Sequence, residues 1–78
     1  MLAKMKTDLV ERYRNCAELA HADGSNELDY LESKGDYETT NFLESISGKE
    51  VELVFTGGDA FEREDNNIWL PDSLWDPA

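Results

Sequence analysis

Apolar residues recur at intervals of three and four along the first quarter of the chain. This spacing places them on one face of an amphipathic helix, and it predicts a long helix over residues 3–22 that Gly24 terminates. A core face is the first interpretation of this stripe. A helix of 20 residues is about 30 Å long, which is long for so small a core, so a homodimer seam is the second interpretation. The stripe consists of Leu2, Met5, Leu9, Tyr13, Cys16 and Ala20.

A second, shorter helix is expected directly after the first. Ser25 or Asn26 has a side chain that can cap its first turn, because both residue types accept a hydrogen bond from a free backbone N–H group. Leu28 and Leu31 are its core positions. Gly35 marks its end, since glycine readily adopts the left-handed conformation that follows a helix.

A third helix of one or two turns is expected from a capping-box pattern. Asn41 would be the N-cap, and the side chain of Glu44 would return to its backbone N–H group. Gly48 ends this element. The first half of the chain is therefore predicted to be helical throughout.

The pattern changes to alternation in the second half of the chain. Alternating apolar and polar residues are typical of a half-buried strand. Glycines at residues 57–58 and the run of Asp and Asn at residues 65–67 favour tight turns, which predicts a three-stranded antiparallel meander that Pro71 ends. A short 3₁₀ turn is expected over residues 72–75. The three predicted strands are residues 51–55, 60–64 and 68–70.

The register of the first hairpin decides where its carboxylates lie. A two-residue loop would place acidic residues such as Glu64 on the apolar face. A three-residue loop, residues 57–59, instead pairs Phe55 with Phe61 and Glu52 with Glu64. Burying a carboxylate costs several kcal/mol, whereas a cross-strand repulsion at the surface costs up to about 1 kcal/mol. The three-residue loop is therefore expected, and it predicts an outer sheet face rich in carboxylates.

Together these elements predict an α+β fold in one small domain over residues 1–78. N-terminal helices, one long and one or two short, occupy residues 1–47 and pack on a C-terminal three-stranded antiparallel meander over residues 49–75. A chain of this length buries only about 60% of its unfolded surface. Binding to a partner or to a second copy is therefore expected to add stability.

Charge is distributed unevenly along the chain. Eighteen Asp and Glu residues face seven Lys and Arg residues, which gives a formal net charge of −11. Residues 1–14 carry four basic and two acidic residues, a net +2, whereas residues 15–78 carry sixteen acidic and three basic residues, a net −13. Direct nucleic-acid binding is disfavoured, because phosphate contacts require clusters of Lys and Arg.

No arrangement of residues indicates catalysis, a cofactor or a metal ion. Cys16 is the single cysteine and His21 the single histidine, which excludes an intramolecular disulfide and a Cys/His zinc site. Carboxylates are plentiful, but nothing in the sequence places one of them in an apolar pocket for acid–base chemistry. We therefore expect a protein that is not an enzyme. A lone thiol favours a cytoplasmic location, and no apolar run approaches the roughly 20 residues of a membrane helix.

Two acidic groups and one aromatic residue are the candidate partner-binding positions. The first group is a stripe on the second helix, for which a solvated face is the simpler interpretation. The second group is the predicted outer face of the sheet. Trp69, expected opposite Glu64, is either an anchor for a partner or packed under a helix, and Trp75 presents the same alternatives. The candidates are Asp29, Glu32 and Asp36 on the helix, and Glu50, Glu52, Glu62, Glu64 and Trp69 on the sheet.

The first functional hypothesis is an acidic inhibitor that occupies a basic, nucleic-acid-binding surface of a target protein. Carboxylates on helices and strands can imitate the regular negative charge of a phosphate backbone. In size and charge the chain resembles phage-encoded antagonists of host nucleases, including anti-CRISPR and anti-restriction proteins. That resemblance implies a protein partner with a basic channel, such as a guide-RNA nuclease.

The second hypothesis is a small dimeric regulatory module whose acidity serves solubility alone. The first helix would form its interface. The C-terminal strands with residues 71–74 are also similar to the end of an SH3-type barrel, where a short 3₁₀ turn follows a strand. This resemblance covers under half of the chain.

Overall fold

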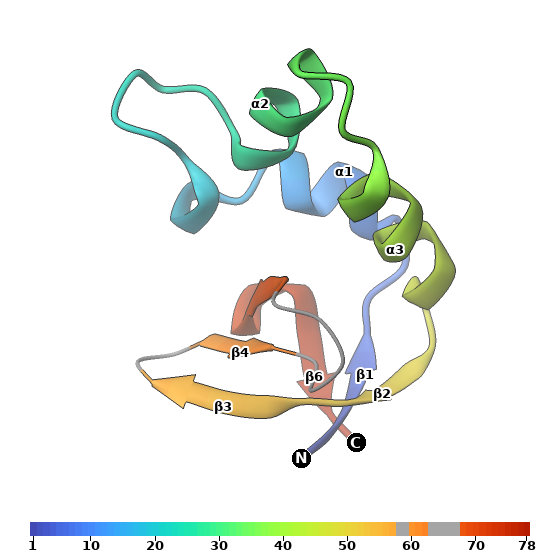
Figure 1. The fold of residues 1–78 in the computed structure, drawn as a ribbon. Coiled ribbons are helices and arrows are strands. Elements are labelled where there is room, and N and C mark those ends of the chain that lie inside the picture. Colours follow the sequence, from blue (N-terminus) through green and yellow to red (C-terminus); the bar gives the residue numbers. More distant parts are fainter. Residues whose placement is uncertain (58–59, 63–67) are drawn as a thin grey trace.

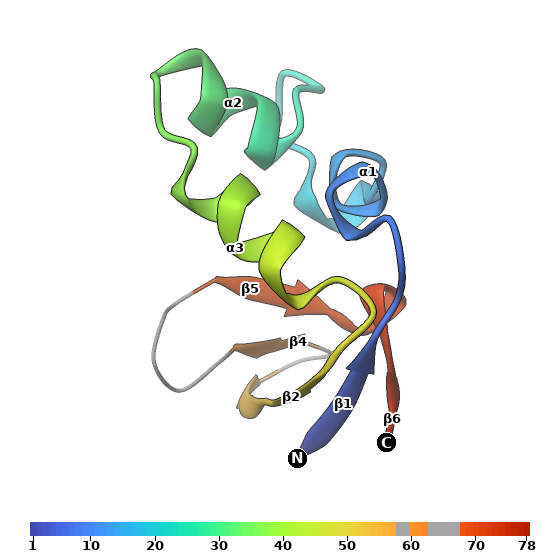
Figure 2. The same ribbon diagram turned by 90° about the vertical axis from the view of Figure 1, so that its right-hand side faces the viewer.

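The computed structural model describes residues 1–57, 60–62 and 68–78, and for residues 55–57 and 60–62 it describes the backbone alone. Helices form one layer and strands form the other, with both chain ends at the far side of the strand layer (Figures 1 and 2). In chain order the elements are β1 (Leu2–Met5), α1 (Leu9–Arg14), the 3₁₀ helix η1 (Ala17–Leu19), α2 (Glu27–Ser33), α3 (Glu38–Ile46), β2 (Glu50–Glu52), β3 (Val54–Gly57), β4 (Ala60–Glu62), β5 (Trp69–Pro71), the 3₁₀ helix η2 (Asp72–Leu74) and β6 (Trp75–Pro77).

The described strands form two antiparallel three-stranded sheets. One has the order β2-β1-β6 and joins the start of the chain to its end, whereas the other has the order β3-β4-β5. The α+β class predicted from the sequence is confirmed. The single C-terminal meander is not, because the first predicted strand is divided between the two sheets.

The predicted long helix over residues 3–22 is wrong. Residues 2–5 form strand β1, in which Ala3 and Met5 are buried and Lys4 is exposed. Asp8 then adopts a left-handed conformation with φ of 54°, which no residue inside an α-helix can have. Helix α1 follows, and the chain is extended again at Cys16. The apolar spacing of three and four therefore continues through a strand, a short helix and a 3₁₀ turn.

The second predicted helix is confirmed, including its cap. Asn26 precedes α2, and its side-chain oxygen accepts a hydrogen bond of 2.8 Å from the backbone N–H group of Leu28. Gly35, which follows the helix, has φ of 81°. Glycine adopts this conformation without the steric cost that a Cβ atom would add.

The third predicted helix exists, but its predicted start is wrong. Helix α3 begins at Glu38 and not after Asn41, which lies inside the helix. The carboxylate of Asp36 accepts a hydrogen bond of 3.1 Å from the backbone N–H group of Glu38, so Asp36 supplies the first-turn contact. Gly48 follows the end of the helix with φ of 73°, as predicted.

The strand predicted over residues 51–55 bends at Leu53. Leu53 belongs to neither sheet ladder; its side chain is buried and its N–H group donates a 2.8 Å hydrogen bond to the carbonyl oxygen of Met1. The predicted pairing of Phe55 with Phe61 is present. Glu52, in contrast, pairs with Leu2 and not with Glu64, since its strand belongs to the other sheet.

One hydrophobic core joins the helices to both sheets. Trp75 is part of it, with 5% of its surface exposed and its indole N–H group 3.0 Å from the carbonyl oxygen of Leu70. The 3₁₀ turn expected over residues 72–75 is present as η2, which lies between β5 and β6. The buried core residues are Ala3, Met5, Leu9, Tyr13, Leu19, Leu28, Leu43, Ile46, Leu53, Leu70, Leu74 and Trp75.

Candidate functional site

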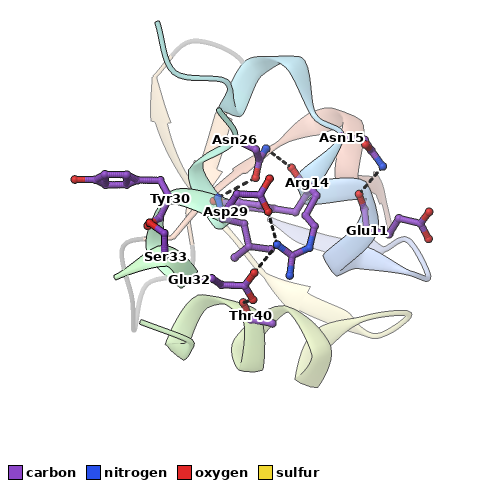
Figure 3. Close-up of polar contacts among 11 residues, drawn as sticks. Glu11, Arg14, Asn15, Asn26, Asp29, Tyr30, Glu32, Ser33 and Thr40 are labelled. Atoms are coloured by element: carbon purple, nitrogen blue, oxygen red, sulfur yellow. Dashed lines mark hydrogen bonds and ion pairs between the residues drawn. The ribbon is translucent and has the colours of Figure 1, made fainter. Parts of the chain in front are cut away.

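The acidic stripe predicted on the second helix faces a cation of the same chain. The guanidinium group of Arg14, at the end of α1, lies 2.5 Å from a carboxylate oxygen of Asp29 and 2.5 Å from one of Glu32 (Figure 3). Glu32 also accepts a 2.8 Å hydrogen bond from the hydroxyl group of Thr40 on α3. These contacts tie α1, α2 and α3 together. Two of the three predicted stripe residues therefore form an internal ion-pair cluster.

The electrostatics of the cluster agree with its geometry. The hydrogen bond from Arg14, and then that from Thr40, lower the pKa of Glu32 below its ordinary value. The hydrogen bond to Glu32, and then that to Asp29, raise the pKa of Arg14. Both shifts favour the charged forms, so Arg14 balances one of the two negative charges of Asp29 and Glu32.

The remaining stripe residue, Asp36, is exposed and serves the helix that follows it. Its side-chain oxygen accepts a hydrogen bond from Glu38 at the start of α3. A carboxylate at this position also interacts favourably with the positive end of the helix dipole. Asp36 therefore does not belong to the Arg14 cluster, and its charge is stabilised by the backbone N–H group at the start of α3.

The outer face of the β2-β1-β6 sheet carries two of the four predicted sheet carboxylates, Glu50 and Glu52, but also cations. Glu50 and Asp76 are exposed and flank the central Lys4 in the register. The carboxylate of Glu52 forms a 2.7 Å ion pair with the N-terminal amino group of Met1. This face is therefore partly neutralised, and its third acidic member, Asp76, was not predicted.

The other predicted sheet residues lie apart from Glu50 and Glu52. Glu62 belongs to β4 in the second sheet, where it pairs with Trp69; its side chain and the whole of Glu64 lie outside the described residues. The predicted pairing of Trp69 with Glu64 is thus wrong, because Trp69 stands opposite Glu62, two residues earlier in the chain. Trp69 itself is 38% exposed.

A different group of carboxylates is exposed around α1 and has no cationic partner among the described residues. Asp8 and Glu11 lie at the start of α1, Glu18 lies on η1 and Glu44 lies on α3, and none of the four forms an ion pair with a described residue. We name these four residues the α1 carboxylates. The nearby cation Arg14 is held by α2, as described above.

Two surface hollows flank α1 and are lined by these carboxylates. A hollow of about 600 Å³ adjoins η1 and η2 and is lined in part by Asp8, Glu11 and Glu18, together with one cation, Arg12. A second hollow, of about 440 Å³, adjoins α3 and is lined in part by Asp8, Glu11 and Glu44. Asp8 and Glu11 therefore form a ridge between two concave surfaces.

Sequence reasoning missed this site because it treated residues 1–14 as a basic segment. Lys4 is placed on a strand beside two acidic residues, and Arg14 is held by α2. Arg12 remains exposed, with its side chain bonded to the backbone oxygen of Thr7 at 2.8 Å. The feature of the sequence that could have indicated this site is Asp8, which lies between strand β1 and helix α1.

Other classes of site have no counterpart in the described part of the chain. No group of three or more His, Cys, Asp or Glu side chains is placed there to hold a metal ion. None of its helices is long and apolar enough to cross a lipid bilayer. No family model matches the sequence, and no curated protein or solved structure shows significant similarity to it.

Proposed function

We propose that this chain is a non-enzymatic binding protein that occupies the basic, nucleic-acid-binding surface of another protein. The observation that carries the proposal is the set of α1 carboxylates, which are exposed and form no ion pair with a described residue. Lys and Arg residues that hold phosphates can hold carboxylates with the same hydrogen-bond geometry. The acidic surface would thus take the place of a nucleic-acid backbone.

The distribution of internal ion pairs supports this choice of surface. Two predicted stripe residues are held by Arg14, and the face of the β2-β1-β6 sheet contains Lys4 and the N-terminal amino group. The negative charge that gives the net −11 is therefore less balanced by cations on other surfaces than on these two, and the surface around α1 is one of those other surfaces. Unpaired like charges repel one another within the free folded chain. Binding of a cationic partner would reduce this repulsion.

The class of target follows from the same chemistry. A nuclease that binds DNA in a channel lined by Lys and Arg presents a dense positive surface, and a small acidic protein that fills it would block entry of DNA. We therefore propose an inhibitor of the anti-CRISPR or anti-restriction type that acts in the cytoplasm. Electrostatic steering would make its association fast and sensitive to salt.

Displacement of DNA tests this function. Labelled duplex DNA is bound to each member of a set of restriction and guide-RNA nucleases at low ionic strength, and the chain is then added. We expect release of DNA from at least one nuclease, with weaker release as salt is raised. Polyglutamate of matched total charge is the control for simple competition between polyanions. Release no stronger than that caused by polyglutamate, for every nuclease in the set, would contradict the proposal.

A further inference from the structure

A third hollow lies between the helical layer and strand β5, and Trp69 forms part of its wall. Its volume is about 380 Å³, near the small end of the roughly 300–1,000 Å³ that ligand sites usually have. Figure 2 shows β5 directly beneath the helices that supply the opposite wall. The residues that matter for its chemistry are Tyr13, Glu18, His21, Glu27, Leu31 and Trp69. We name it the Trp69 hollow.

Trp69, an aromatic residue in the wall of this hollow, is partly exposed. Trp69 is 38% exposed, and its side chain forms no hydrogen bond or ring contact with any described residue. Tyr30, which stands nearby against His21, already has the ammonium group of Lys34 over its ring at 4.4 Å. Trp69 therefore resembles Tyr30 in exposure, but no cation of the described residues lies over its ring.

Tyr13 adds an unpartnered polar atom to the hollow. The residue is 98% buried, since only 2% of its surface is exposed, and its hydroxyl group forms no hydrogen bond within the described ranges. No fully buried side-chain oxygen or nitrogen of the described residues lacks a partner, so this hydroxyl group reaches solvent, and the hollow adjoins it. Burial, followed by the charge of Glu27, raises the pKa of Tyr13 to about 12. The group stays a neutral donor and acceptor at physiological pH.

Two carboxylates give the hollow its charge. Glu18 is exposed and has no cationic partner among the described residues, and it also lines the hollow beside η2. Glu27 forms a hydrogen bond with the ring of His21 through one carboxylate oxygen, which leaves its other oxygen available. An aromatic wall, two carboxylates and a free hydroxyl group fit a cation that carries several N–H donors.

We infer that the Trp69 hollow receives an arginine side chain of the protein partner, an inference that rests on the proposed function. A guanidinium group is planar, stacks on aromatic rings and donates in a fork to carboxylates, whereas the ammonium group of lysine is compact and strongly hydrated. Glu18 belongs both to the α1 carboxylates and to this hollow. A partner that contacts the α1 carboxylates could therefore also place an arginine in the hollow. The small volume suits one side chain.

Titration with a minimal ligand tests the inference without the partner. N-acetyl-arginine amide is added to the chain while the indole N–H signal of Trp69 is followed by NMR, and the uncharged citrulline analogue is the matched control. We expect a saturable shift of the Trp69 signal with arginine and none with citrulline. Equal responses to the two ligands, or a response at Trp75 alone, would overturn the inference.

Variants locate the binding to the hollow. Replacing the ring in Trp69→Ala should weaken arginine binding roughly 3- to 30-fold, the range that a cation–π contact of about 0.5–2 kcal/mol provides. Glu18→Gln removes a charge at an exposed position where folding is not at risk, and it should also weaken binding. Glu44→Gln is the charge-matched control outside the hollow. Equal weakening by Glu18→Gln and Glu44→Gln would contradict the inference.

The outcomes separate this inference from the proposed function. If the chain displaces DNA from a nuclease and Trp69→Ala and Glu18→Gln displace it equally well, the arginine anchor is wrong and the function stands. If arginine binds the hollow but no nuclease releases DNA, the hollow is a cation site and the proposed function is wrong.

Discussion

Individual buried polar side chains stabilise this fold, and Asn26 is an example. Asn26 is 7% exposed, and it both caps α2 and donates a 2.8 Å hydrogen bond from its amide nitrogen to the carbonyl oxygen of Tyr13. It therefore joins the end of α1 to the start of α2. Asn41, the residue that the capping-box pattern favoured, is exposed inside α3 and performs no such task.

The two asparagines make a matched pair of substitutions. Asn26→Ala should lower the free energy of unfolding by about 1–3 kcal/mol, because the helix loses its cap and the carbonyl oxygen of Tyr13 keeps only its longer hydrogen bond, of 3.3 Å, from the N–H group of Cys16. Asn41→Ala should change it by less than about 0.5 kcal/mol. Urea denaturation measures both. Equal effects of the two substitutions would contradict the assignment of Asn26 as the cap.

Arg14 should determine part of the acid sensitivity of the protein. The folded-state pKa of Glu32 lies below its ordinary value of 4.5, so this group contributes stability above that pH and loses it as the pH falls through the lowered pKa. In Arg14→Met the main cause of the lowering is absent, and stability should fall less steeply below pH 4.5. Asp23 keeps its own pKa lowered by Ser25, so some pH dependence remains. Unfolding followed by urea between pH 3 and pH 6 measures the difference, and parallel curves for the two proteins would contradict it.

At the scale of the elements, several local signals in the sequence were reliable, although the capping-box pattern at Asn41 was not. The cap at Asn26, the glycines that end the helices and the pairing of Phe55 with Phe61 are set by neighbouring residues, and the structure has all of them. Strand β1 was missed because its partners, β2 and β6, come from the other end of the chain. An apolar spacing of three alone cannot distinguish Leu2 and Met5 in a strand from the same residues in a helix.

The candidate site was only partly predictable for the same reason. Carboxylates were expected to lie on helix and strand surfaces, and Asp29, Glu50 and Glu52 are exposed there, but their partners depend on contacts between distant segments. Arg14 and Asp29 are 15 residues apart, and the amino group of Met1 and Glu52 are 51 residues apart. Neither ion pair has a local sequence signal. The unpaired set around α1 could be recognised only after these pairs were known.

The turn between α3 and β2 allows a test of an element boundary. Gly48 has φ of 73°, and a Cβ atom there would lie 3.5 Å from the methyl group of Thr7, an ordinary contact. Gly48→Ala should therefore cost about 1–2 kcal/mol through backbone conformation alone. Gly48→Asn should cost less, because asparagine adopts this conformation more readily. Chemical denaturation measures both, and an unchanged stability of Gly48→Ala would contradict the boundary.

At the scale of the whole molecule, net charge acts across the entire fold. The molecule measures 33 × 25 × 21 Å, whereas the screening length is about 30 Å at 0.01 M salt and about 3 Å at 1 M salt. At low salt each of its charges therefore acts on nearly all the others. A net charge of −11 then destabilises the compact state by self-repulsion.

Added salt should accordingly stabilise the protein. The melting temperature in sodium chloride should rise as the concentration is increased from about 0.01 M to 1 M, because repulsion is screened over shorter distances. Circular dichroism during heating measures the transition. A melting temperature that falls over this range would mean that internal ion pairs outweigh the repulsion, and it would contradict the view that unpaired carboxylates dominate the electrostatics.

The most direct measurement compares two triple variants with equal net charge in the displacement of DNA from a nuclease. One variant neutralises α1 carboxylates (Asp8→Asn, Glu11→Gln, Glu44→Gln), and the other neutralises the β2-β1-β6 sheet face (Glu50→Gln, Glu52→Gln, Asp76→Asn). The concentration that releases half of the DNA should rise about tenfold or more for the first variant, from three contacts of roughly 0.5 kcal/mol each, and should change little for the second. Equal changes for the two variants would show that total charge alone determines binding, and they would contradict the assignment of the α1 surface as the binding site.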